Sequence, residues 1–147
     1  TAISRLAADS WRLTTDVTSS GLLTSWERVD EATSTTLGSG MTYSSGTFNV
    51  PNAGRWLILL TVDARANPSG GDAFVGVFLS IDGDLAGFGG FTDSGSNVGG
   101  PSTMTFLGSL TTSNNITFEA VSVTAGQING VTDINETHVT FVRLGDA

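Results

Sequence analysis

The chain has no cysteine and no lysine, and it has one histidine and three prolines among its 147 residues. Without cysteine there is no disulfide framework, thiol nucleophile or zinc–thiolate site. All six cations are arginine, and with 14 carboxylates they give a formal net charge of −8. We therefore expect no binding to nucleic-acid phosphates and none to an anionic membrane surface. The apolar runs are far too short to span a bilayer.

Glycine, threonine and serine are abundant, which is typical of β-strands joined by short turns. The length suits a single domain. Asp82-Gly83 lies between two alternating apolar segments and predicts a two-residue hairpin turn. Seven or more short strands separated by turns predict a sandwich or a barrel. The predicted strands are 46–50, 54–66, 72–82, 84–91, 102–110, 114–125 and 137–144.

The predicted strand 54–66 is apolar on both faces. Alternate residues from Trp56 to Ala64 share one face, and Leu57 and Leu59 share the other. Such a strand needs its own core on one side and a second cover on the other. We favour another subunit as that cover, and the alternative is a loop or the N-terminal segment. The candidate interface residues, taken from this strand and from 72–82 and 114–125, are Leu57, Leu59, Phe74, Phe78, Val121 and Val123.

Residues 1–40 are predicted to form an N-terminal arm or extra hairpin, and residues 41–147 the β-domain. Trp11 and Trp26, with Arg12 and Arg28 beside them, allow two interpretations. The tryptophans anchor the hairpin as core residues, or all four residues bind a partner, since tryptophan and arginine are favoured at interface hot spots.

No constellation of residues predicts catalysis, so we expect no enzyme and no cofactor. His138 is the lone histidine, and no Gly-x-Ser-x-Gly nucleophile motif is present. The glutamates are scattered, which leaves a polysaccharide hydrolase as a minor alternative. Asp82, Asp84, Asp93 and Asn97 could offer oxygens to Ca²⁺, but turn geometry already explains Asp82-Gly83. We therefore predict no metal site, with calcium kept as a lesser possibility.

The segment Gly46-Thr-Phe-Asn-Val-Pro-Asn-Ala-Gly-Arg-Trp56 resembles the G-x-F-x-V-P-x-x-G-x-Y signature of C1q/TNF-like domains. Val77–Gly83, Thr103–Val123 and Val139–Leu144 resemble later strands of that family. Asn114-Asn115 replaces the family's Gly-Asp, and the Ser-Gly of its last strand is missing. Over residues 41–145 the resemblance implies an antiparallel jelly-roll β-sandwich that forms a homotrimer.

A second resemblance concerns the segments Asp9–Asp16 and Trp26–Asp30, which are similar to the openings of structural proteins of tailed phages, notably those of cyanobacteria. This resemblance implies a virion protein. Our first hypothesis is a trimeric cement or decoration protein on the outer capsid surface, bound to the major capsid protein. The alternative is the head of a tail fibre or spike that binds a host receptor or glycan through loops 67–72, 89–101 and 126–136.

Overall fold

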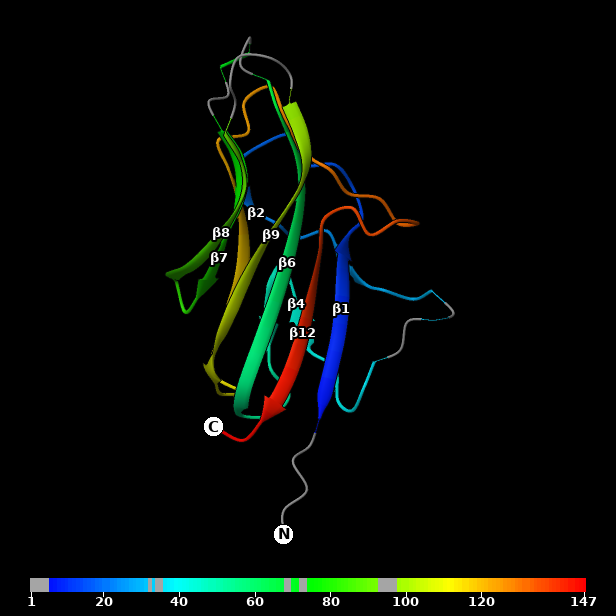
Figure 1. Cartoon of the computed structure of the whole chain (residues 1–147), viewed down its shortest axis with the longest axis vertical. Coiled ribbons are helices and arrows are strands. Elements are labelled where there is room, and N and C mark those ends of the chain that lie inside the picture. Colours follow the sequence, from blue (N-terminus) through cyan, green and yellow to red (C-terminus); the bar gives the residue numbers. More distant parts are fainter. Residues whose placement is uncertain (1–5, 32, 34–35, 68–69, 72–73, 93–97) are drawn as a thin grey trace.

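The computed structural model describes residues 6–31, 33, 36–67, 70–71, 74–92 and 98–147. These residues form two antiparallel β-sheets that pack face to face around one core (Figure 1). They contain no α-helix. Within this part of the chain, no helix is therefore long and apolar enough to cross a membrane.

The two sheets each have six strands among the described residues. Sheet A has the order β11–β6–β12–β1–β3, with β9 paired to β6, and sheet B has the order β4–β5–β10–β7–β8, with β2 paired to β10. Sheet A comprises β1 (Ala7–Leu13), β3 (Trp26–Arg28), β6 (Gly54–Ala66), β9 (Val98–Leu110), β11 (Gln127–Ile128) and β12 (His138–Gly145). Sheet B comprises β2 (Gly21–Leu22), β4 (Thr42–Ser44), β5 (Thr47–Asn49), β7 (Phe74–Ile81), β8 (Asp84–Thr92) and β10 (Ile116–Val121).

The chain changes sheet repeatedly, between β5 and β6, β6 and β7, β8 and β9, and β9 and β10. Because many consecutive strands belong to opposite sheets, each layer is completed only when distant parts of the chain have folded. This connectivity, with antiparallel pairing throughout, is that of a jelly roll. The predicted all-β antiparallel jelly-roll sandwich is therefore confirmed.

Strand β6 has the most extensive strand pairing in sheet A. Along one side it pairs with β9 from Gly54↔Leu110 to Ala66↔Val98, and along the other side it pairs with β12 and β11. Its side chains alternate as the sequence predicts: Trp56, Ile58, Leu60, Val62 and Ala64 are buried, and the residues between them are only partly covered or exposed.

Most predicted strands agree with the structure within a few residues, and 54–66 agrees at both ends. Residues 72 and 73, at the start of one predicted strand, lie outside the described residues. The hairpin at Asp82-Gly83 is also confirmed. Both residues have positive φ, 53° and 87°, as a type I′ turn requires.

The expected division at residue 40 does not separate two structural units. Strand β1 pairs with β12 from Ala7↔Arg143 to Arg12↔His138, and β3 pairs with β1. The N-terminal segment therefore supplies two strands of sheet A, and Figure 1 shows β1 lying beside β12. A local pattern predicts a strand, but it does not indicate that the pairing partner is 130 residues away.

The core is organised around the ring of Phe48, which is fully buried. Its ring centroid lies 5.2 Å from that of Trp11, 5.9 Å from Trp26 and 5.3 Å from Phe141. Phe118 and Tyr43 also contact it. Since these rings come from both sheets, the aromatic cluster ties the two sheets together.

Replacing this central ring tests the importance of the cluster. We expect Phe48→Ala to lower the free energy of unfolding by about 3–5 kcal/mol, because it leaves a cavity among five aromatic neighbours. Phe88→Ala is the matched control: its side chain is 40% exposed on β8, and its expected loss is about 1 kcal/mol or less. Denaturant unfolding followed by tryptophan fluorescence measures both, and equal losses would contradict this account of the core.

Candidate functional site

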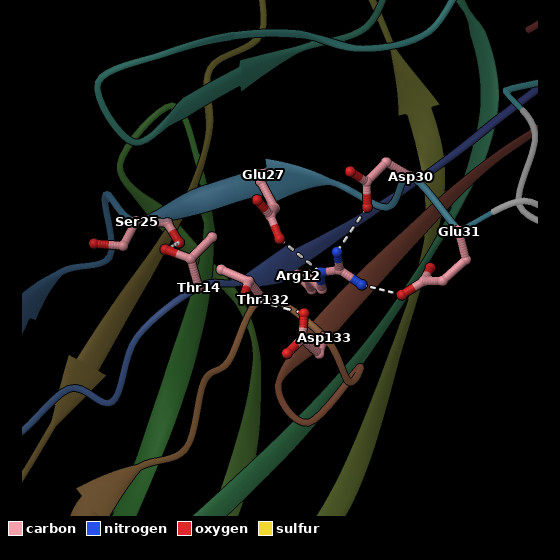
Figure 2. Close-up of polar contacts among 8 residues, drawn as sticks. All are labelled: Arg12, Thr14, Ser25, Glu27, Asp30, Glu31, Thr132 and Asp133. Carbon is pink, nitrogen blue, oxygen red and sulfur yellow. Dashed lines mark hydrogen bonds and ion pairs between the residues drawn. The ribbon is translucent and has the colours of Figure 1, made fainter.

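Arg12, one of the predicted partner-binding residues, is buried and bound within the chain. Its side chain is 3% exposed, and its guanidinium lies among Glu27, Asp30 and Glu31 (Figure 2). Nε donates to Glu27 at 2.7 Å and Nη2 to Asp30 at 2.8 Å, and Nη1 donates to Glu31. Burial alone would lower the pKa of Arg12, but the carboxylates of Glu27 and Glu31 raise it overall. These bonds from Arg12 hold residues 27–31 against β1.

The two tryptophans are also core residues, so the interpretation of Trp11, Arg12 and Trp26 as a partner-binding arm is wrong. Trp11 and Trp26 are 8% and 6% exposed. The Trp11 indole N–H donates to Asp9, and the Trp26 indole N–H donates to the carbonyl of Leu23. Side chains that pack inside the sandwich present no anchor to a partner.

Arg28 is half-exposed but is held by internal contacts. Its guanidinium lies 4.8 Å from the Trp11 ring centroid, and Nε donates to the buried carboxylate of Asp9 at 3.0 Å. Asp9 also accepts the backbone N–H of Met41. These bonds tie the end of the 29–41 segment to β1, which gives Arg28 a structural role.

The outward face of sheet A carries two of the predicted interface residues, Leu57 and Leu59, both half-buried. In register, Leu57 lies between Leu107 of β9 and Val142 of β12, and Val142 lies beside Ala8 of β1. Leu107 is 61% exposed. An apolar row therefore crosses four strands: Leu107, Leu57, Val142 and Ala8. The next row consists of one leucine and three short hydroxyl side chains: Thr105, Leu59, Thr140 and Ser10.

The other predicted interface residues do not share this face. Phe74, Phe78 and Val121 lie half-buried on the outward face of sheet B. Phe88 of β8 contacts both phenylalanines, with ring centroids 6.1 and 5.4 Å away, and lies over Gly76, where an added Cβ would come within 2.5 Å of its ring. These rings cover one another within one chain.

Val123 is 6% exposed and belongs to the core, so its prediction as an interface residue is wrong. The segment after β10 turns at Ser122, whose φ is positive at 56°. This turn breaks the strand alternation that had placed Val123 beside Val121, and the side chain points inward instead.

The residues weighed for catalysis or calcium are dispersed. His138 is half-buried on β12, with Nδ1 3.2 Å from the Glu136 carbonyl oxygen. The Asp82 carboxylate accepts the Asn115 backbone N–H and the Asn114 side-chain amide, and these bonds lower its pKa. Asp93 and Asn97 lie outside the described residues. Across the described ranges, no three or more His, Cys, Asp or Glu residues are grouped to hold a metal ion.

A cavity of about 540 Å³ opens near the end of β6. Gly99 and Gly100 come from the 89–101 segment, and Asn129 and Glu136 come from the segment between β11 and β12. The cavity therefore lies between the start of β9, which was predicted as part of the loop 89–101, and the loop between β11 and β12. The residues that line it are Asp63, Ala64, Arg65, Gly99, Gly100, Asn129 and Glu136.

Glu136 lines this cavity and is half-buried. Burial raises the pKa of its carboxyl above the ordinary value of 4.5, and repulsion from Asp63 and Asp16 raises it further. In the sequence, Glu136 is one of several scattered glutamates. No local pattern places it near Asp63, because the two residues are 73 positions apart in the chain.

We expect Arg12→Met to lower the free energy of unfolding by about 2–3 kcal/mol, because three carboxylates lose their shared cation. The loss is smaller than for a fully buried pair, since the carboxylates keep contact with water. Arg65→Met is the control: Arg65 is exposed on β6 and forms no ion pair with the described residues. Denaturant unfolding compares them, and similar losses would contradict a structural role for Arg12.

Glu136→Gln is expected to stabilise the protein in a pH-dependent way. Because the native pKa is raised, the stability contributed by the protonated carboxyl is complete below pH 4.5 and is lost as pH rises through the native pKa. The gain of the variant over wild type should therefore be near zero at low pH and grow toward neutral pH. Unfolding curves at several pH values measure it. Glu119→Gln, on the exposed face of β10, controls for the charge change, and a gain independent of pH would refute the account.

Comparisons with known proteins find similar folds at low sequence identity. Murine APRIL at pH 8.5 is 13% identical, covers 95% of this chain and 99% of its own, and has a TM-score of 0.69. Murine APRIL at pH 5.0 has the same identity and coverage and a TM-score of 0.71. Eiger TNF from S. frugiperda is 13% identical, with coverage of 97% and 95% and a TM-score of 0.72.

No protein-family model matches the chain, and no curated protein matches it. At 13% identity the structural likeness concerns the fold and not the activity. It extends over nearly the whole length of both chains. The chain therefore has a TNF-like jelly-roll fold, as its sequence signature at 46–56 led us to expect.

Proposed function

We propose that this chain is a non-catalytic structural protein of a virion, a homotrimeric decoration protein on the outer capsid surface. The observation that carries the self-association is the outward face of sheet A. Its apolar row crosses four strands without a charged residue, and Leu107 within it is 61% exposed. Burying such a row gains about 25 cal/mol per Å².

The surface chemistry supports sheet A over sheet B as the self-association face. On sheet B the three phenylalanine rings already pack on one another and on Gly76, and Glu119 lies in register with Phe78. On sheet A the two rows consist of aliphatic side chains and short hydroxyl side chains. Short side chains lose little conformational entropy when they pack against another sheet.

The virion assignment is supported by the sequence resemblance to tailed-phage structural proteins. In this proposal the protein acts mechanically: it bridges capsid subunits and adds binding energy that opposes internal pressure. Because Trp11, Arg12 and Trp26 are buried, the contact with the major capsid protein is made by other residues than the arm first expected.

The second candidate is the head of a tail fibre or spike. The observation that favours it is the cavity near the end of β6, which is lined by residues of the predicted recognition segments 89–101 and 126–136. The trimer would serve this role equally well. The two candidates differ in where the protein lies on the particle and in what it binds.

Self-association is tested by native mass spectrometry of wild type and two variants. We expect wild type to be a trimer and Leu107→Lys to be monomeric, because a lysine in the apolar row would be buried without a partner and close to Arg55, which lines the same small hollow. Leu22→Lys is the matched control, since Leu22 is 47% exposed on sheet B. A monomeric wild type, or a Leu107→Lys variant that stays trimeric, would contradict the proposed interface.

The location is tested by immunogold electron microscopy of virions produced by the genome that encodes the chain. Label over the capsid surface is the result expected of a decoration protein. Label at the tail tip would favour the fibre head instead. Particles without label would contradict both candidate functions. The result on self-association would be unaffected.

A further inference from the structure

The cavity near the end of β6 has walls that hydrogen bonds hold in place. The Asn129 backbone N–H donates to the Asp63 carbonyl at 2.7 Å. Thr137, which is fully buried, accepts the Asp63 N–H and donates back to the Asp63 carbonyl. Asp16 accepts the Gly130 N–H at 3.1 Å and thereby holds the same loop. The site is therefore largely formed before any ligand arrives.

The lining groups differ in what they offer to a ligand. The Asp63 and Glu136 carboxylates accept hydrogen bonds, the Arg65 guanidinium donates them, and the Asn129 amide does both. Arg65 forms no ion pair within the described part of the chain, so its donors are available. Gly99 and Gly100 add no side chain to their part of the wall, which lets a ligand approach the backbone.

This combination of groups excludes several ligand classes. An anion would meet the carboxylates of Asp63 and Glu136 in the cavity, and Asp16 acts on Glu136 with the same sign of charge. A cation would pair with the carboxylates but would lie beside Arg65. An apolar ligand would remove water from three charged side chains without replacing the hydrogen bonds. A hydroxyl group both donates and accepts, so it satisfies the carboxylates and the guanidinium alike.

We propose that this cavity is a carbohydrate-binding site that takes a neutral, hydroxyl-rich sugar. Carboxylate, guanidinium and amide groups each present two coplanar polar atoms, and these match the spacing of adjacent hydroxyls on a pyranose ring. The volume of about 540 Å³ falls within the range of small-ligand sites. The inference deepens the receptor-binding candidate above and rests on it for its biological role, but it does not depend on the trimer.

The test uses saturation-transfer NMR with free neutral hexoses, N-acetylhexosamines and uronic acids, and isothermal titration calorimetry for any sugar that binds. We expect a neutral sugar to bind wild type and uronic acids to bind more weakly. Asp63→Asn and Arg65→Met should each weaken binding about tenfold or more, because each removes hydrogen bonds made by a charged group. Thermal unfolding of each variant confirms that it is folded.

Arg55→Met is the matched control for Arg65→Met. Both arginines lie on the outward face of β6, both are exposed, and neither forms an ion pair with the described residues, but Arg55 lies outside this cavity. Sugar binding should be unchanged in Arg55→Met. Absence of binding to wild type at millimolar sugar, or equal binding by wild type, Asp63→Asn and Arg65→Met, would overturn the proposal.

The oligomeric state is measured on the same samples, so the two proposals fail separately. If the protein is a monomer and binds a neutral sugar through Asp63 and Arg65, the proposed sugar site is supported and the proposed trimer is refuted. If the protein is a trimer and binds none of the sugars, the proposed sugar site is refuted and the proposed self-association is supported.

Discussion

The rest of the structure depends on the position of β6, which pairs with other strands along both of its edges and packs against the core on one face. Its alternate residues from Trp56 to Ala64 point inward and are buried in the core. Its backbone pairs with β9 along one edge and with β12 and β11 along the other. The same strand presents Leu57 and Leu59 outward and carries Asp63 and Arg65 at its end. The core, the proposed self-association face and the proposed sugar site are therefore positioned by one element.

The N-terminal segment illustrates how tertiary pairing decides the role of a residue. Trp11 and Arg12 are neighbours on β1, and their side chains point to opposite sides of the sheet. Trp11 packs on Phe48 in the core, and Arg12 is bound by the carboxylate of Glu27 on β3 and by those of Asp30 and Glu31, which follow β3 in the chain. Tryptophan and arginine are favoured at hot spots for the same reasons that make them good internal clamps: large contact area and several directed donors.

Two surfaces of the sandwich differ in the kind of contact that they can make. The outward face of sheet A offers an apolar row, which favours a dry contact with another sheet. The cavity at the end of β6 offers fixed polar groups of both charge signs. Because both lie along β6, a trimer formed through sheet A would present its three cavities at the same end of the assembly, where a multivalent ligand gains affinity through effective concentration.

The sequence by itself determined the fold class, most strand positions and the hairpin at Asp82-Gly83, because alternation with period two and positive-φ turn residues are local properties of the chain. It also identified Leu57 and Leu59 as the outward residues of β6. The tertiary structure decided that Trp11, Trp26 and Val123 are core residues and that Phe74 and Phe78 are covered by Phe88. It alone brought Asp63 and Arg65 next to Glu136. Register between distant strands fixes these contacts, and register is set by the packing of the whole sandwich and not by the residues nearby in sequence.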